Sequence, residues 1–87
     1  MTKQIDQDVL TMKNILSSKF VLEKDEIKKV REYLGFSQAY LANAFGLKDR
    51  SSIAHFESGR KSLDVSKNYQ LCDMLKNKLR DEGHKDV

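Results

Sequence analysis

The chain of 87 residues is 39% hydrophobic and 33% charged, a composition that fits one folded domain and excludes a disordered chain. No apolar run approaches the roughly 20 residues of a membrane span and no signal segment is present, so we expect a cytoplasmic protein. The net charge of +3 is compatible with a polyanionic partner without requiring one, and the lone Cys72 excludes an internal disulfide and is expected to pack inward.

Helices are expected along the whole chain because it contains no proline and only four glycines. Apolar residues recur at helical spacing in almost every segment, and no segment alternates with the period of two that marks a strand. We therefore predict an all-α fold of five helices. It has three parts: an N-terminal helix and connector over residues 1–22, a central domain over 23–80 and a polar tail over 81–87.

The first predicted helix, over about residues 4–17, carries one apolar stripe that has to be buried somewhere. The stripe consists of Ile5, Val9, Met12 and Leu16. It belongs either to the protein's own core or to a surface over residues 5–16 that meets a twin or another protein, and the sequence leaves both open. A short apolar connector, Phe20 to Leu22, is expected to dock on the core.

A second helix is predicted from about Asp25 to Leu34, with Ile27, Val30 and Leu34 facing inward. Acidic residues in its first turn suit the positive end of the helix dipole, and Gly35 ends the helix.

The third predicted helix begins after Ser37, a good N-terminal cap, and ends at Gly46, which allows the left-handed backbone of a tight turn. Leu41 and Phe45 lie four apart on its inner side, and several alanines keep the helix slim.

A fourth helix, Arg50 to Ser58, is predicted with Asp49 as its cap and Gly59 as its end. Ile53 and Phe56 lie three apart on its inner face. The last helix is expected from Asp64 or Ser66 to Arg80, and the tail after it is expected to fray. The inner side of this helix is predicted to hold Tyr69, Cys72, Leu75 and Leu79, with Leu71 beside them.

Two short helices joined by a tight glycine turn are typical of a helix-turn-helix. Ala42 falls where the two helices approach most closely, so a larger side chain there would separate them. The outer face of the second helix offers donors and small side chains suited to base edges in a DNA groove. This face consists of Arg50, Ser51, Ala54, His55 and Ser58.

The stretch from Ile27 to Leu75 resembles the XRE-type family of phage repressor and Cro-like helix-turn-helix domains. Two segments carry the resemblance, LGFSQAYLANAFGL and SSIAHFESGRK. The matching residues are Arg31, Leu34, Gly35, Ser37, Gln38, Leu41, Ala42, Phe45, Gly46, Ile53, Glu57, Gly59 and Arg60. The resemblance implies a five-helix domain like that of lambda repressor, here with an extra N-terminal helix that the family does not explain.

Carried over residue by residue, the resemblance implies three groups of functional residues. Gln38 matches a position that bonds a DNA phosphate with help from helix N-terminal amides. The positions that read bases are matched by Arg50, Ser51, Ala54 and His55. The loop that grips the backbone with its cations and exposed amides is matched by Ser58, Gly59, Arg60 and Lys61. Arg31 and Glu57 match a structural ion pair.

The sequence also departs from the family pattern. Gly46 and Ile53 are seven residues apart, one more than the family usually has, and the extra residue is most simply Lys48. It lengthens the turn and is expected to shift or tilt the fourth helix. The family's proline after SGRKS is missing. The string DRSSIAH is also similar to the origin-binding helix-turn-helix of bacterial replication initiators, over a shorter stretch.

The function implied is sequence-specific binding of double-stranded DNA by a homodimer that regulates transcription, most simply as a repressor or autoregulator. A protein-interaction module on the same scaffold, as in antitoxins and adaptors, is the alternative. A replication or recombination accessory factor is a third possibility. The chain carries no paired Cys and His ligands, no nucleophile beside a base and no glycine-rich phosphate loop, so no enzyme, cofactor or metal is expected.

Overall fold

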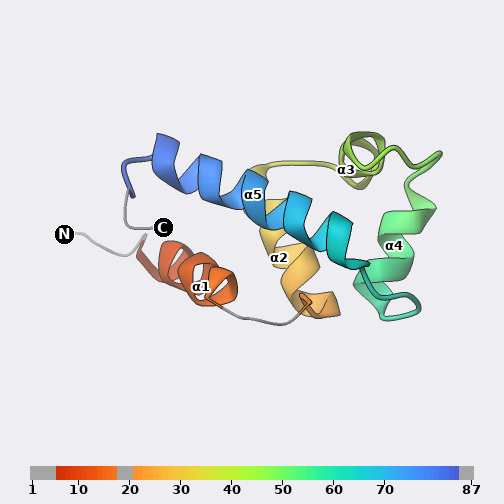
Figure 1. Cartoon of the computed structure of the whole chain (residues 1–87), viewed down its shortest axis with the longest axis horizontal. Helices are drawn as coiled ribbons and strands as arrows, with labels where there is room; N and C mark the ends of the chain where they lie inside the picture. Colours follow the sequence, from red (N-terminus) through yellow and green to blue (C-terminus); the bar gives the residue numbers. More distant parts are fainter. Residues whose placement is uncertain (1–5, 18–20, 85–87) are drawn as a thin grey trace.

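The computed structural model describes residues 6–17 and 21–84, and this part of the chain forms five α-helices and no strand. In chain order they are α1 (Asp6–Leu16), α2 (Lys24–Leu34), α3 (Gln38–Ala44), α4 (Ser51–Ser58) and α5 (Val65–Asp81) (Figure 1). The predicted all-α, five-helix architecture is confirmed. No helix in the described part is long and apolar enough to cross a membrane.

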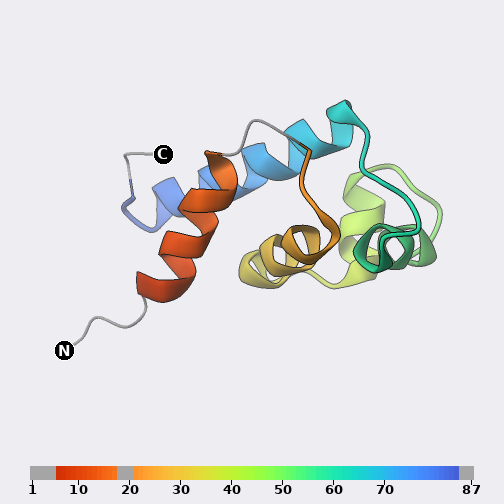
Figure 2. The ribbon, with the colours of Figure 1, turned by 90° about the horizontal axis from the view of Figure 1, so that it is seen from below.

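The helices build an elongated molecule of 42 × 24 × 19 Å with α5 along its length (Figure 1). α2 packs on α5 in the middle, while α3 and α4 lie together at one end. α1 packs on α5 and on α2 toward the opposite end, as the turned view in Figure 2 also shows. The short helices α3 and α4 are therefore well separated from α1.

One hydrophobic core joins all five helices. Residues such as Ile27 and Val30 of α2 and Leu41 of α3 are almost completely hidden from solvent. The core consists of Met12, Ile15, Leu22, Ile27, Val30, Leu41, Ala42, Ile53, Phe56, Leu63, Leu71, Leu75 and Leu79. This cluster includes residues of α1 and the connector residue Leu22. The described residues before α2 therefore share one core with the rest of the chain.

The apolar stripe of α1 belongs to this core. Met12 is only 3% exposed and Val9 and Leu16 are partly buried, whereas Ile5 lies outside the described residues. Ile15, which does not belong to the predicted stripe, is also buried. The connector is held as well, because the Leu22 N–H donates to the side chain of Asn68 at 2.9 Å; Phe20 lies outside the described residues.

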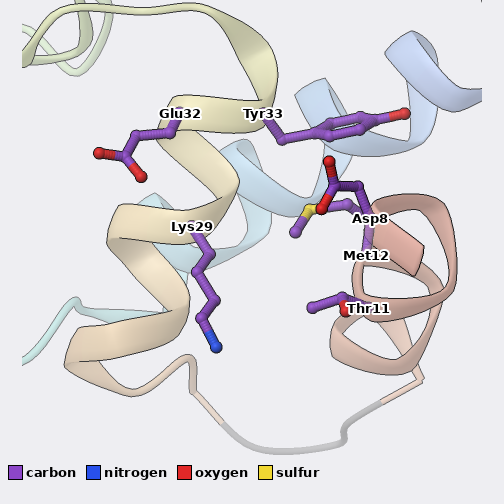
Figure 3. Close-up of a pocket in the computed structure, with 6 residues that line it drawn as sticks. All are labelled: Asp8, Thr11, Met12, Lys29, Glu32 and Tyr33. Atoms are coloured by element: carbon purple, nitrogen blue, oxygen red, sulfur yellow. The ribbon is translucent and has the colours of Figure 1, made fainter. Parts of the chain in front are cut away.

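A hollow of about 430 Å³ separates parts of α1 and α2 (Figure 3). Residues of both helices line it, with Asp8 and Thr11 on α1 and Lys29, Glu32 and Tyr33 on α2. Met12 also lines it. Beside this hollow, α1 packs on α5 as well as on α2.

The ends of α2 follow from local hydrogen bonds. The Glu26 carboxylate accepts from the Glu23 N–H at 2.9 Å, so the helix begins at Lys24, one residue earlier than predicted. Gly35 ends the helix with a φ of 78°, in the left-handed region that favours glycine.

One prediction for the last helix is wrong. Its buried stripe is Leu71, Leu75 and Leu79, and Tyr69 is 71% exposed instead of facing inward, whereas Cys72 is half-buried and packs against the core as expected. Leucines four residues apart form a straighter line along a helix than the predicted set, and α1 and α2 pack on that line.

The start of the tail is also ordered where fraying was expected. The helix runs to Asp81, and the His84 N–H donates to the Leu79 carbonyl at 2.9 Å. The hydroxyl of Tyr33 also donates to the Glu82 carboxylate, which ties this end of α5 to α2. Residues 85–87 lie outside the described part.

Candidate nucleic-acid interface

A side-chain cap fixes the start of α3, and a glycine forms the turn between α3 and α4. The Ser37 hydroxyl oxygen accepts from the Tyr40 N–H at 3.0 Å, which starts α3. Gly46 has a φ of 76°, and the next residue, Leu47, donates its N–H to the Ala42 carbonyl at 2.8 Å. Since Ala42 is buried and small, α4 can pack closely against α3.

The extra turn residue is taken up before α4 begins. The Asp49 carboxylate accepts from the Ser51 N–H at 2.9 Å and from the Ser51 hydroxyl, and α4 starts at Ser51. Arg50 thus lies just before the helix, not within it as predicted. The same two bonds, the hydroxyl one foremost, lower the pKa of Asp49. Ile53 is nevertheless 0% exposed, so the longer turn leaves α4 seated on the core.

α4 has a buried face and an open one. Ile53 and Phe56 point into the core, whereas Arg50, Ser51 and Ser58 are exposed. Ala54 and His55, which are also predicted base readers, are half-buried. The open face therefore presents guanidinium, hydroxyl and imidazole groups, which are donors of the kind that read base edges. Within residues 6–17 and 21–84, no three His, Cys, Asp or Glu residues are grouped so that they could hold a metal ion.

Arg31 and Glu57 form a two-pronged ion pair between α2 and α4. The Arg31 Nε lies 2.6 Å from one Glu57 oxygen, and an Nη lies 3.1 Å from the other. The side chains are only 11% and 6% exposed. The hydrogen bond to Glu57, opposed by burial, raises the pKa of Arg31. Arg31 also donates to the Phe36 carbonyl at 2.9 Å, so it fixes the chain between α2 and α3.

Gln38 joins the same network. Its side-chain Nε2 donates to the Glu57 carboxylate at 3.1 Å, which adds α3 to the helices that Glu57 holds together. The sequence predicts a phosphate contact for Gln38 but not this bond. A side-chain amide nitrogen has two hydrogens, so one remains for another acceptor.

The loop after α4 differs from the prediction in one respect. Gly59 ends α4 with a φ of 87°, as a glycine cap does. The N–H groups of Gly59, Arg60 and Lys61 all donate back to carbonyls of α4, at 3.3, 2.9 and 3.3 Å. These amides are therefore not the exposed donors that the resemblance implies, whereas the side chains of both cations lie at the surface.

A lysine from outside the predicted site lies over this loop. If Gly59 had a Cβ atom, that atom would lie 3.1 Å from Cδ and 4.0 Å from Nζ of Lys24. Lys24 is the first residue of α2 and is exposed. Because it is 35 positions before Gly59, no local sequence pattern could place it there.

The comparisons with known proteins agree with this geometry. A sequence profile of the helix-turn-helix family matches residues 27–81, which span α2 from its first turn through the end of α5. No curated protein and no solved structure matches the chain.

Proposed function

The chain belongs to the XRE-type helix-turn-helix family of DNA-binding transcription regulators, and from this premise we propose that it binds duplex DNA sequence-specifically with α4 in the major groove. We further propose that it acts as a homodimer and represses transcription, including that of its own gene. One observation carries this proposal most directly: α4 buries Ile53 and Phe56 and leaves its opposite side open to solvent in the described chain.

The open side has the chemistry for direct readout. In this proposal Arg50 reads a guanine through its two-pronged guanidinium, and the Ser51 hydroxyl bonds a neighbouring base. The methyl group of Ala54 suits contact with a thymine methyl, and the His55 imidazole adds a further donor or acceptor. Arg50 precedes the first turn of α4, so it reaches bases from the end of the helix that enters the groove.

The proposed phosphate contacts come from α3, from the end of α4 and from the loop after it. Gln38 on α3 uses the amide hydrogen that Glu57 leaves free, and Glu57 fixes its orientation. At the end of α4 and in the loop, Ser58, Arg60 and Lys61 contact the backbone through their side chains. Gly59 contributes by shaping the loop, because its own N–H is donated to Phe56.

Two copies are proposed because one recognition helix reads only a few base pairs. A two-fold symmetric dimer places two such helices in successive major grooves, about 34 to 36 Å apart. The bound site is then a palindrome with half-sites about one helical turn apart.

Selection of bound sites from a random duplex oligonucleotide pool tests this function. The expected result is an enriched palindrome whose affinity falls steeply with salt, since each neutralised phosphate adds about 0.9 to the slope of log affinity against log salt. Enrichment of a single half-site would reject the homodimer. Failure to enrich any sequence, with no binding to random DNA at low salt, would reject DNA binding itself.

A protein-interaction module of the antitoxin or adaptor type is the second candidate. The observation that favours it is Leu10, a large apolar residue that is 54% exposed on α1. We place it second because Met12 and Ile15 on the same helix are already used by the core. A pull-down that recovers a stable stoichiometric partner from the native host, bound through residues 5–16 and excluding DNA, would reverse this order.

A further inference from the structure

The backbone N–H groups of the loop after α4 are already used within the protein, so they are not available to bind an anion. Its three successive N–H groups, from Gly59 to Lys61, are donated to carbonyls of His55 and Phe56. Each such bond caps the C-terminal end of α4, so releasing it would expose carbonyls of that helix. Contacts between this loop and a phosphate therefore depend on side chains.

Lys24 brings one more cation to the same place. Its aliphatic chain passes so close to Gly59 that a Cβ atom there would make a tight contact of 3.1 Å with the Lys24 Cδ, and the lysine chain would have to shift by a few tenths of an ångström. Lys24 and Lys61 also line one surface hollow of about 440 Å³, whose apolar floor includes Ile27 and Phe56. The methylene groups of a lysine can rest on such a floor while the ammonium group stays in water.

The balance of charge at this hollow is positive. Its charged lining residues are Lys24, Lys61 and Glu23, two cations against one carboxylate, and next to them in the chain Arg60 adjoins Lys61 and Asp25 adjoins Lys24. A surface with several cations around a short loop attracts a polyanion and neutralises its phosphates.

We propose that Lys24 is a further phosphate-binding residue, the third cation beside Arg60 and Lys61, and that the three hold the DNA backbone beside the end of α4. The proposal rests on the function proposed above and extends it beyond the matched residues 27–81, because Lys24 lies before them. Gly59 then has a second role. It ends α4, and its missing side chain leaves room for Lys24 to reach the loop.

The test compares Lys24→Met with Lys29→Met in the full chain. Both lysines are exposed on α2, but Lys29 faces the hollow between α1 and α2 (Figure 3). Affinity for a selected site and for random duplex is measured between 50 and 200 mM salt, with thermal unfolding as a check of folding.

Lys24→Met is expected to reduce the salt slope by about 0.9 for both DNAs, so that the wild type loses about 3.5-fold more affinity than this variant over the salt range. Lys29→Met and the rescue variant Lys24→Arg are expected to keep the wild-type slope. A folded Lys24→Met protein with an unchanged slope would overturn the role of Lys24 alone. If the wild type shows no salt-dependent binding to any DNA, the proposed function fails together with this one.

Discussion

At the scale of single residues, Glu57 connects stability to DNA binding. Its two carboxylate oxygens take three hydrogen bonds, two from Arg31 and one from Gln38. The first two join α2 to α4, and the third holds a proposed phosphate contact in place. One side chain thus sets both the packing of α4 and the position of a residue at its edge.

Replacing Glu57 by alanine is expected to destabilise the fold by about 3 to 5 kcal/mol, because the Arg31 guanidinium would remain buried without its partner. Urea unfolding followed by circular dichroism measures this change. The double variant Arg31→Met with Glu57→Leu serves as the control, and it is expected to regain most of the lost stability, since no unpaired charge remains. Equal stability of Glu57→Ala and the wild type would show that the pair contributes little.

Arg50→Ala is expected to weaken binding to a selected site by about 1 to 3 kcal/mol and to relax the preference at one base position. The physical reason is the loss of a two-pronged hydrogen bond to one base. Gln38→Ala is expected to weaken binding to all sequences alike, because a phosphate contact carries no sequence information.

Competition binding with a set of single-base site variants distinguishes these two effects. Lys76→Ala provides the matched control, since Lys76 is exposed on α5, outside both proposed groups of contact residues. If neither Arg50→Ala nor Gln38→Ala changes binding to any duplex, the proposed docking of α4 is wrong.

At the scale of elements, the start of α5 depends on a carboxylate cap whose charged form is favoured by folding. The Asp64 carboxylate accepts from the Lys67 N–H at 2.8 Å and starts α5, and this bond lowers the pKa of Asp64 below its ordinary value of 3.8. A pKa that is lower in the folded state means that folding favours the charged form. The stabilisation is therefore complete above pH 3.8 and is lost as the pH falls through the lowered pKa.

Asp64→Asn is expected to make the free energy of unfolding less dependent on pH in the acid range. Asparagine caps a helix about as well as aspartate but carries no titrating charge. Thermal unfolding followed between about pH 2 and pH 7 measures this. The comparison variant is Asp73→Asn, which removes an exposed carboxylate from the middle of the same helix, away from its cap. If the stability of Asp64→Asn fell in acid as steeply as that of the wild type, the capping role of the Asp64 carboxylate would be contradicted.

The elements themselves were predictable because their ends carry strong local signals. Ser37, Gly35 and Gly59 act at helix ends, as their residue types predict. The inner face of α5 was less predictable, since Tyr69 lies three residues before Cys72 and Leu71 lies four residues before Leu75, so both fit a helical stripe and only packing against α1 and α2 decides between them.

Within the candidate site, the sequence also led to the pair of Arg31 and Glu57, through the family resemblance. It did not reveal the bond of Gln38 to Glu57, the inward bonds of the loop amides or the approach of Lys24 to Gly59. Each of these features depends on tertiary packing or on the hydrogen bonds that end α4. The residue type at a single position predicts neither of them.

At the scale of the whole molecule, α1 lies at the end of the molecule opposite to α3 and α4 (Figure 1). α1 packs on α5 and α2, and the profile match begins only at residue 27. The bond between Tyr33 and Glu82 lies at the same end and joins α2 to the end of α5. The carboxylate and the burial of the ring raise the pKa of Tyr33 to about 12, with burial the larger cause.

The contribution of α1 to the fold can be measured with two substitutions on the same helix. Met12 is 3% exposed and Leu10 is 54% exposed. Met12→Ala leaves a cavity between α1 and the rest of the core, so it is expected to cost about 2 to 5 kcal/mol in urea unfolding. Leu10→Ala removes little buried surface and is expected to change stability by no more than about 0.5 kcal/mol.

If α1 instead served mainly to hold a partner, both substitutions would leave the stability of the isolated protein unchanged, and Leu10→Ala would reduce the binding of that partner. A large loss of stability for Met12→Ala alone would therefore show that α1 belongs to the one core that also holds α2, α4 and α5.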